Sequence, residues 1–390
     1  MKNIVVYVDC LERFFFFSRF CKSDNNFIFI TSRLSIYLKS KWMNINCYLL
    51  KRSRRELSID EKVFIESENI DLMQKNHSMN DAMLLFTSIE NVLAKKVKKI
   101  DYLFVWNGSG TVGKAFKASS EKLNIPILYF EISNLPNSLF VDPEGVNAKS
   151  SIYKSEDKID LYRIPTSFDF DEWLIKYEES KSKPLPQAKN KGKWNFLYLI
   201  DTAWSYSIGL KEVIINKKIN GITKQKNICP VVEKMGNLSD DYILLPLQVS
   251  SDSQLLLNSD YKNEDMIKIA IAQAKINQVK LFIKIHPAEN DYSYLEGEYD
   301  NFVTFVVNPT VDLIKHSQLV IVNNSTVGLE AMIYGKKVQV YGLCIYKNFN
   351  NERLHKYISS YLVNGIDYFS SETIQTQELN LILKRAFTDE

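Results

Sequence analysis

The fold of this chain is constrained most strongly by short apolar runs that end abruptly in polar residues. The run 242–245 has the length and composition of a strand buried on both faces of a parallel sheet, and small, amide and acidic residues follow it. A second run, 281–285, ends in His286 and Pro287, and a third, 319–322, ends in hydrogen-bonding residues. Because ligands of open α/β sheets bind beyond the carboxyl ends of the strands, these three ends predict one common crevice.

Segments of the same kind recur along the chain. In the first half we expect strands at 4–8, 27–31, 45–50, 102–106 and 125–130, with a helix at 111–123. In the second half we expect further strands at 303–307 and 337–341, and helices at 327–334 and 373–387. A strand, a helix and a second parallel strand form a βαβ unit with a right-handed crossover. The pattern therefore predicts an α/β fold.

The length of 390 residues is too great for one ordinary core, so we expect two domains. The stretch 180–194 is rich in proline and lysine, which predicts a linker or an exposed loop. We therefore expect one Rossmann-like domain at 1–185 and a second at 186–372, with an interdomain cleft, as in GT-B-like proteins. The helix in 373–390 could pack back on the first domain.

Composition and charge narrow the functional classes. The formal net charge of +3 argues against a dedicated nucleic-acid surface. The five cysteines, at positions 10, 21, 47, 229 and 344, lack the spacing of a metal site or a disulfide framework, which indicates a reducing compartment. No run reaches the roughly 18 apolar residues that a transmembrane helix needs. We expect a cytoplasmic protein without a signal peptide.

Two segments leave membrane contact open. The run Phe14–Phe17 predicts the start of a core helix, and the alternative is a loop that contacts a lipid or an acceptor. The lysine-rich stretch 211–226 predicts a solvated helix face, and the alternative is contact with anionic lipid headgroups on the inner membrane.

A glycine-rich loop follows the expected strand at 102–106. Gly108, Gly110 and Gly113 match the G-x-G-x-x-G pattern, and Glu131 ends the next strand about 20 residues further on. Such dinucleotide fingerprints usually open their domain, whereas this one lies about 100 residues into the chain. We therefore favour a loop at which a substrate approaches the backbone of Gly108 and Gly110, with NAD(P) binding as the alternative.

Four motifs, in order and spacing, resemble the capsule polysaccharide biosynthesis family that contains KpsS and KpsC. Three of them are Pro246-Leu-Gln-Val with Asp252-Ser-Gln254, then Lys284-Ile-His286-Pro287, then Asn324-Ser-Thr-Val-Gly328. The fourth is Phe130-Glu131 with Glu144-Gly-Val-Asn-Ala148 and Ser150-Ser151, and it resembles KpsS more than KpsC.

The resemblance implies a retaining β-Kdo glycosyltransferase that uses CMP-β-Kdo as donor and needs no cofactor. It implies that the first domain binds the acceptor and the second binds the donor. The implied acceptor is lysophosphatidylglycerol or a Kdo-lipid, on which the Kdo linker of a capsule is built. Other capsule assembly proteins are implied as possible partners.

Candidate catalytic residues follow from the chemistry of retention. Double displacement needs a carboxylate nucleophile and a group that deprotonates the acceptor hydroxyl. We assign Asp252 as nucleophile, with a helix cap as the alternative, and Glu131 as base, with a plain surface carboxylate as the alternative. His286, beside Lys284, would balance the negative charge of the donor, or it would protonate the departing phosphate. The alternative is that His286 has only a structural role.

The remaining candidates would bind the donor. Asn324, Ser325 and Thr326 precede the helix expected at 327–334, whose first N–H groups would bind a phosphate, and an ordinary helix cap is compatible with this. Glu330 would accept hydrogen bonds from the ribose. Further contacts are expected from residues at the first two strand ends, namely Gln248, Ser253, Gln254, Lys284 and Pro287.

We expect no metal, because a CMP-sugar offers one phosphate and cationic side chains can serve it. The string Asp169-Phe-Asp171 resembles a metal-binding DxD motif, but it lies outside the strand-end pattern and indicates a solvated acidic turn. Two other functions remain open. One is another GT-B-like transferase, such as a CDP-glycerol glycerophosphotransferase, and the other is a non-catalytic capsule assembly or export factor.

Overall fold

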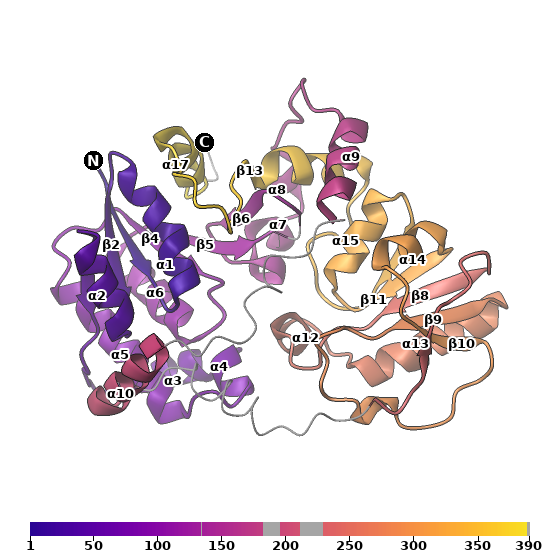
Figure 1. Ribbon diagram of the computed structural model, residues 1–390. Helices are drawn as coiled ribbons and strands as arrows, with labels where there is room; N and C mark the ends of the chain where they lie inside the picture. The colour runs from indigo at the N-terminus through magenta and orange to yellow at the C-terminus, as the bar shows by residue number, and fades with distance from the viewer. Residues whose placement is uncertain (134, 182–195, 211–228, 388–390) are drawn as a thin grey trace. The chain divides into compact units, whose positions relative to one another are not determined.

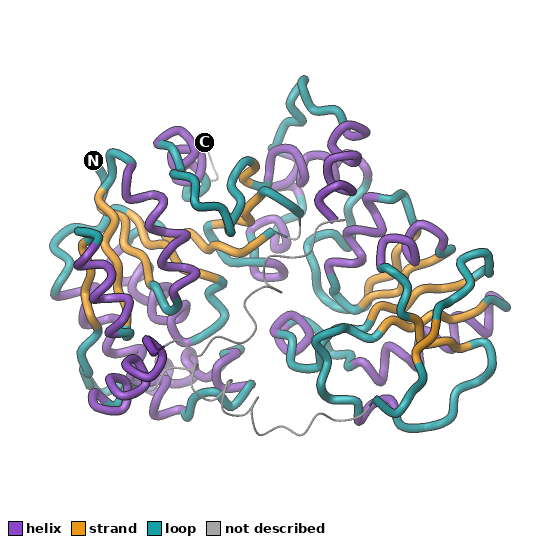
Figure 2. Tube along the Cα trace, in the orientation of Figure 1, coloured by secondary structure: helices purple, strands orange, loops and turns teal. Residues whose placement is uncertain are grey.

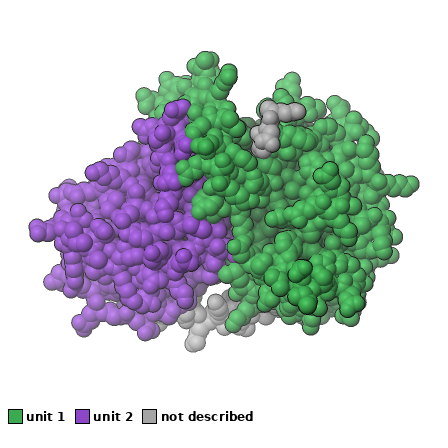
Figure 3. All heavy atoms as spheres, turned by 180° about the vertical axis from the view of Figure 1, so that it is seen from behind, with its two compact units in different colours: residues 1–219, 355–390 green, residues 220–354 purple. Residues whose placement is uncertain are grey.

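The computed structural model describes residues 1–133, 135–181, 196–210 and 229–387 (Figure 1). It divides into two compact units, which are coloured separately in Figure 3. Unit 1 comprises Met1–Ile219 and His355–Glu390, and unit 2 comprises Asn220–Leu354. Most of the expected linker at 180–194 and the whole of the lysine-rich stretch 211–226 lie outside the described residues.

Unit 1 is built on a seven-stranded sheet in the order β13-β6-β5-β4-β1-β2-β3. Strands β1 to β5 are parallel to one another, and at one edge β6 pairs antiparallel with β5 and β13 pairs antiparallel with β6. The strands are β1 Asn3–Tyr7, β2 Asn26–Thr31, β3 Asn46–Leu49, β4 Tyr102–Trp106, β5 Ile127–Ile132, β6 Ser138–Asp142 and β13 Val363–Asn364. The helices are α1 Leu11–Ser18, α2 Leu34–Trp42, α3 Ile59–Glu66, α4 Ile70–Met73, α5 Met79–Lys95, α6 Thr111–Leu123, α7 Ser151–Lys154, α8 Asp157–Asp160, α9 Phe170–Lys181, α10 Phe196–Ile208 and α17 Thr376–Lys384.

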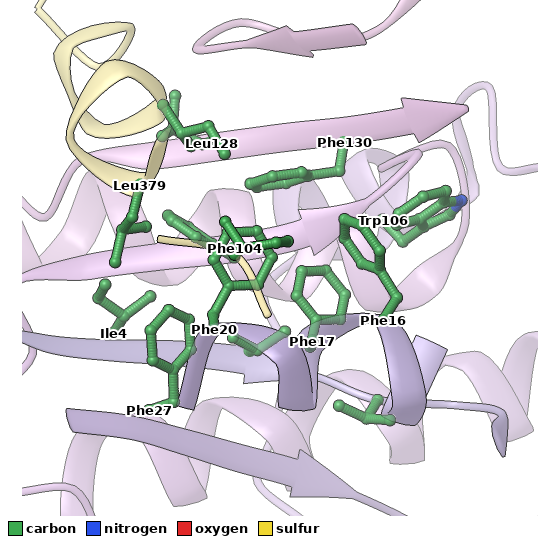
Figure 4. Close-up of a cluster of buried hydrophobic side chains, with 14 of the residues drawn as sticks. Ile4, Phe16, Phe17, Phe20, Phe27, Phe104, Trp106, Leu128, Phe130 and Leu379 are labelled. Atoms are coloured by element: carbon green, nitrogen blue, oxygen red, sulfur yellow. The ribbon is translucent and has the colours of Figure 1, made fainter. Parts of the chain in front are cut away.

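A cluster of aromatic side chains fills one face of this sheet (Figure 4). Phe14, Phe16 and Phe17 of α1 are buried, whereas Phe15 is 49% exposed, because a helix turns one residue of such a run toward solvent. The expectation that Phe14–Phe17 starts a core helix is confirmed. Leu379 of α17 belongs to the same cluster, so the end of the chain completes the core that its beginning starts.

Unit 2 is built on a six-stranded parallel sheet in the order β12-β11-β8-β9-β10-β7. Its strands are β7 Glu233–Lys234, β8 Tyr242–Pro246, β9 Lys280–Lys284, β10 Val303–Val306, β11 Leu319–Val322 and β12 Lys337–Val340. Its helices are α12 Ser253–Leu257, α13 Asn263–Asn277, α14 Thr310–His316 and α15 Thr326–Ile333, and α16 Asn351–Lys356 spans the boundary between the units.

Both faces of the second sheet are covered by helices (Figure 2). Alternate residues of β8 explain why, since Ile243 and Leu245 pack in a cluster with α13, and Tyr242 and Leu244 pack in a cluster with α14 and α15. A strand with two buried faces must be apolar throughout, which is the pattern seen at 242–245.

The fold class expected from the sequence is confirmed, since each unit has the alternating strands and helices of a Rossmann-like domain. The unit boundaries differ from the expected 185/186 and 372/373. Helix α10 belongs to unit 1, where the carboxylate of Asp201 accepts hydrogen bonds from the backbone and side chain of Ser35 at 2.7 and 2.5 Å. Residues 355–372 also belong to unit 1, and Arg19 donates to the carbonyls of Asp367 and Glu372.

Among the described helices, none is long and apolar enough to cross a lipid bilayer.

Candidate active site

The order of strands in unit 2 identifies where a ligand should bind. From β8 the chain adds β9 and β10 on one side of the sheet, and then returns to place β11 and β12 on the other side. The carboxyl ends of β8 and β11 therefore flank the topological switch point, where ligands of open α/β sheets bind. The three strand ends singled out in the sequence belong to β9, β8 and β11, which are neighbours in that order.

A buried pair of side-chain amides joins the two strands at the switch point. Nε2 of Gln248 donates to Oδ1 of Asn324 at 3.0 Å, and Oε1 of Gln248 accepts from the Asn324 backbone at 3.3 Å. Nδ2 of Asn324 donates in turn to the carbonyls of Gln254 and Asn258. These contacts give Gln248 and Asn324 a structural role, and their predicted contact with the donor stays a prediction.

Asp252 lies at the start of α12 and acts as its N-cap. Its Oδ1 accepts a hydrogen bond from the backbone of Gln254 at 2.8 Å, and the side chain is half-buried. The cap that was weighed as the alternative is thus present, but it uses only one carboxylate oxygen. Ser253 opens the helix, and the side chain of Gln254 accepts from Asn258 at 2.8 Å. A nucleophilic role for Asp252 stays a prediction.

His286 and Pro287 follow β9 and are exposed. Nδ1 of His286 accepts a hydrogen bond from the backbone of Ala288 at 3.1 Å, so the neutral imidazole carries its proton on Nε2. Nζ of Lys284 donates to the carbonyl of Asn308 at 2.5 Å. Burial lowers the pKa of Lys284, and nearby Glu233 partly opposes this shift.

The start of α15 is closely packed. Oγ of Ser325 accepts from the backbone of Val327 at 3.2 Å, and the hydroxyl of buried Tyr346 donates to the carbonyl of Ser325. Thr326 is the first residue of the helix, and Glu330, one turn further on, is buried. The ordinary helix cap given as the alternative is present, and the binding of a phosphate at this helix start stays a prediction.

One residue of this site was missed by sequence reasoning. Glu289 is only 4% exposed, and its carboxylate accepts hydrogen bonds from the backbone and side chain of Ser250, two residues before Asp252. The single signal in the sequence is an acidic residue three positions after His286.

Unit 1 has a switch point of its own, between β1 and β4. Glu131 lies on β5, the strand next to β4, and is half-buried. Its Oε2 accepts from Nδ2 of Asn107 at 2.5 Å, and its Oε1 accepts from the backbone of Ile132 at 3.1 Å. Burial raises the pKa of Glu131, while Asn107 and Arg13 act in the opposite direction. The description of Glu131 as a plain surface carboxylate therefore does not fit.

The glycine-rich loop is occupied by the protein's own side chains. The Tyr129 ring fills the space where a side chain of Gly108 would lie, and the Asp71 carboxylate does the same at Gly110. Oδ2 of Asp71 also accepts from the backbone of Thr111 at 2.9 Å, at the start of α6. A dinucleotide pyrophosphate would need that position, so the structure disfavours NAD(P) binding. Approach of a substrate to Gly108 and Gly110 stays a prediction.

The Asp169-Phe-Asp171 string lies at the start of α9. Oδ1 of Asp169 accepts from the backbone of Glu172 at 2.9 Å, as expected for an acidic turn before a helix. Within the residues that the structure describes, no group of three or more His, Cys, Asp or Glu side chains is placed to hold a metal ion.

Comparison with known proteins gives one family and a few relatives. Residues 199–349 match the family of the capsule polysaccharide biosynthesis protein. The chain is 25% identical over 274 residues to the capsule polysaccharide export protein KpsS of Escherichia coli, covering 60% of this chain and 64% of that protein. It is 32% identical over 110 residues to protein FixF of Sinorhizobium fredii, covering 27% of each chain. The chain thus spans less than two thirds of either relative.

Two solved structures of one protein, KpsC of Thermosulfurimonas dismutans, are also similar. The β-Kdo 2,7 transferase has a TM-score of 0.45 at 16% identity, covering 98% of this chain and 99% of that one. The β-Kdo 2,4 transferase has a TM-score of 0.39 at 18% identity, covering 73% and 87%. The family match includes the motifs at Gln248, His286 and Asn324, so the resemblance found in the sequence is confirmed.

Proposed function

We propose that this chain, which matches the capsule polysaccharide biosynthesis family over residues 199–349, is a glycosyltransferase that transfers Kdo from CMP-β-Kdo with retention. The observation that carries the proposal is the placement of Asp252, His286 and the start of α15 after three neighbouring parallel strands. A carboxylate, an imidazole and the N-terminus of a helix are the groups that a sugar linked to a single phosphate requires.

The reaction would proceed by two displacements. A carboxylate oxygen of Asp252 attacks the anomeric carbon while the bond from that carbon to the CMP phosphate breaks, and CMP leaves with the bonding electrons. The acceptor oxygen then attacks the same carbon and releases Asp252, and its proton passes to Glu131. Two inversions give net retention. A carboxylate whose pKa is raised by burial is the stronger base, which suits this role.

His286 would serve the departing phosphate. Because its Nδ1 accepts from Ala288, the neutral ring can donate a hydrogen bond from Nε2 to the phosphate. Protonation of the phosphate, the other role considered for His286, would require the imidazolium, in which Nδ1 could not accept from Ala288. The N-terminus of α15, at the backbone N–H of Thr326, would bind a phosphate oxygen, with Glu330 on the ribose. Lys284 would add positive charge at the same strand end. No metal is part of the proposal, and treatment with EDTA is expected to leave turnover unchanged.

The acceptor we propose is lysophosphatidylglycerol or a Kdo-lipid, to which the chain would add Kdo of a capsule linker. This part rests on the similarity to KpsS, a capsule protein by name. An amphiphilic acceptor would place the chain in the cytoplasm with peripheral contact at the inner membrane.

Intact-protein mass spectrometry tests the donor and the nucleophile together. The chain is incubated with CMP-Kdo generated in situ, beside Asp252→Ala and beside Asp260→Ala, an exposed acid that follows α12. We expect the wild-type chain and Asp260→Ala to gain the mass of one Kdo, and Asp252→Ala to gain none.

The other outcomes discriminate between the alternatives. Release of CMP without an adduct, when a lipid acceptor is present, would keep the transferase and remove the covalent step. Turnover of CDP-glycerol in place of CMP-Kdo would indicate a glycerophosphotransferase. No turnover of either donor would favour a non-catalytic assembly or export factor.

A further inference from the structure

The buried carboxylate of Glu289 connects two loops that carry the proposed chemistry. Its Oε2 accepts from the backbone and side chain of Ser250, both at 2.8 Å, and Tyr294 donates to the same oxygen at 3.4 Å. Its Oε1 accepts from the backbones of Asn290 and Asp291 at 2.7 and 3.0 Å. Each partner is a donor, so these contacts require the carboxylate as an acceptor at both oxygens.

The contacts of Glu289 reach both sides of the strand ends. The backbone of Glu289 donates to the carbonyl of His286 at 2.9 Å, which closes the turn that contains Pro287. Ser250 is held further by Nδ2 of Asn263, which donates to its hydroxyl at 3.4 Å and to the Gln248 carbonyl at 2.7 Å. One charged side chain thus ties the loop after β9 to the loop that leads into Asp252.

We propose that Glu289 is a positioning residue, which fixes the loop of Asp252 relative to the loop of His286 so that both address the same donor. This inference rests on the proposed function, because it assigns those two loops to one reaction. Displacement of a reacting group by about 1 Å can lower a rate about 100-fold, so a single buried carboxylate can control turnover without touching the substrate.

Glu289→Gln is the most direct test. The amide keeps the size of the side chain but has one oxygen where the carboxylate has two. In either orientation its NH2 group faces a set of donors, either the two of Ser250 or those of Asn290 and Asp291. In either orientation at least one backbone N–H group, that of Ser250 or those of Asn290 and Asp291, therefore loses its acceptor.

We expect kcat of Glu289→Gln to fall about 10- to 100-fold, while KM for the donor changes less than about threefold. Glu289→Asp, which keeps the charge and both acceptors, should recover part of the loss. Ser250→Ala, which removes one donor and keeps the backbone contact, should lose less than Glu289→Gln. Glu264→Gln, an exposed acid paired with Lys268 on α13, is the matched control and should match the wild-type chain.

Hydrogen exchange gives a readout that does not depend on turnover. In Glu289→Gln, peptides covering 247–256 or 286–295 should exchange at least tenfold faster, while peptides from β4 keep their rates. Wild-type turnover with faster exchange would overturn the positioning role, and unchanged exchange would show that Glu289 does not hold the loops. An inactive wild-type chain would instead refute the proposed function, and the exchange rates would still decide whether Glu289 joins the two loops.

Discussion

The guanidinium of Arg13 lies over the ring of Trp106, 5.3 Å from its centroid, and forms an ion pair with Asp9. Asp9 and Arg13 follow β1, and Trp106 ends β4, so this cluster occupies the switch point of unit 1. The charge of Arg13 also acts on Glu131, where it lowers the pKa that burial raises. The candidate base of the reaction is therefore tuned by a cation at the same switch point.

Removal of that cation should change the pH dependence of turnover. Glu131 must be deprotonated to act as a base, so turnover should fall as the pH drops through its pKa, which lies above the ordinary range. Arg13→Met removes a charge that favours the carboxylate, and the acidic limb of the kcat/KM profile should move to higher pH. Arg54→Met, an exposed arginine in the same unit, should leave the limb in place. A limb that stays fixed in both variants would exclude Glu131 as the titrating group.

Two substitutions in the run Phe14–Phe17 should have contrasting effects on the free energy of unfolding. Phe17 is fully buried against Phe130 and Trp106, so Phe17→Ala should lower the free energy of unfolding by about 3–5 kcal/mol. Phe15 is 49% exposed, and Phe15→Ala should cost about 1 kcal/mol or less. Urea unfolding measures both. A loss of acceptor binding in Phe15→Ala, with stability kept, would support the alternative of acceptor contact.

Substitutions of Gln248 and Asn324, the amide pair at the switch point of unit 2, should have non-additive effects on the free energy of unfolding. Gln248→Leu or Asn324→Leu leaves a buried partner unsatisfied, which costs about 1–3 kcal/mol in the free energy of unfolding. The double variant should cost less than the sum of the two, because the partners are in direct contact. Additive costs in a double-mutant cycle would contradict the pairing of these amides.

Removal of the Asp71 carboxylate should create an anion-binding site at the start of α6. The carboxylate accepts from the backbone of Thr111 at the start of α6, so Asp71→Ala should lower the free energy of unfolding by about 0.5–2 kcal/mol. The freed helix start should then bind inorganic phosphate, and phosphate should raise the melting temperature of Asp71→Ala more than that of the wild-type chain. Asp60→Ala, an exposed acid in the first turn of α3, is the control. An equal response of all three chains would show that Asp71 does not fill an anion position.

Local signals in the sequence were sufficient for some of the regular elements. The helix at 111–123 matches α6 at both ends, because Gly110 precedes it and Asn124, in the left-handed conformation at φ 52°, ends it. Helix α17 is shorter than the predicted 373–387, since its first turn begins only at Thr376. Edge strands such as β7 and β13 contain two residues each and form only by pairing with distant segments, so no hydrophobic periodicity in the sequence predicts them.

The placement of the candidate residues at neighbouring strand ends was predictable from the sequence, but their hydrogen-bond partners were not. Topology puts the ends of β8, β9 and β11 side by side, as expected from three apolar runs that end in polar residues. The partners of those residues come from elsewhere in the chain. Ser250 lies 39 residues from Glu289, and Asp71 lies 40 residues from Thr111, so neither contact has a local signal.

The packing of α17 into the aromatic core of unit 1 bears on the order in which the protein can assemble. Unit 2 is inserted between two parts of unit 1, and Leu379, Ile382 and Leu383 enter a core most of whose other members lie between Ile4 and Val141, before unit 2 in the chain. Domains usually fold in the order in which they leave the ribosome. Here unit 2 can complete its own core first, whereas the core of unit 1 stays incomplete until α17 has been synthesised. Unit 1 would therefore finish folding after unit 2, although its first strands precede unit 2 in the chain.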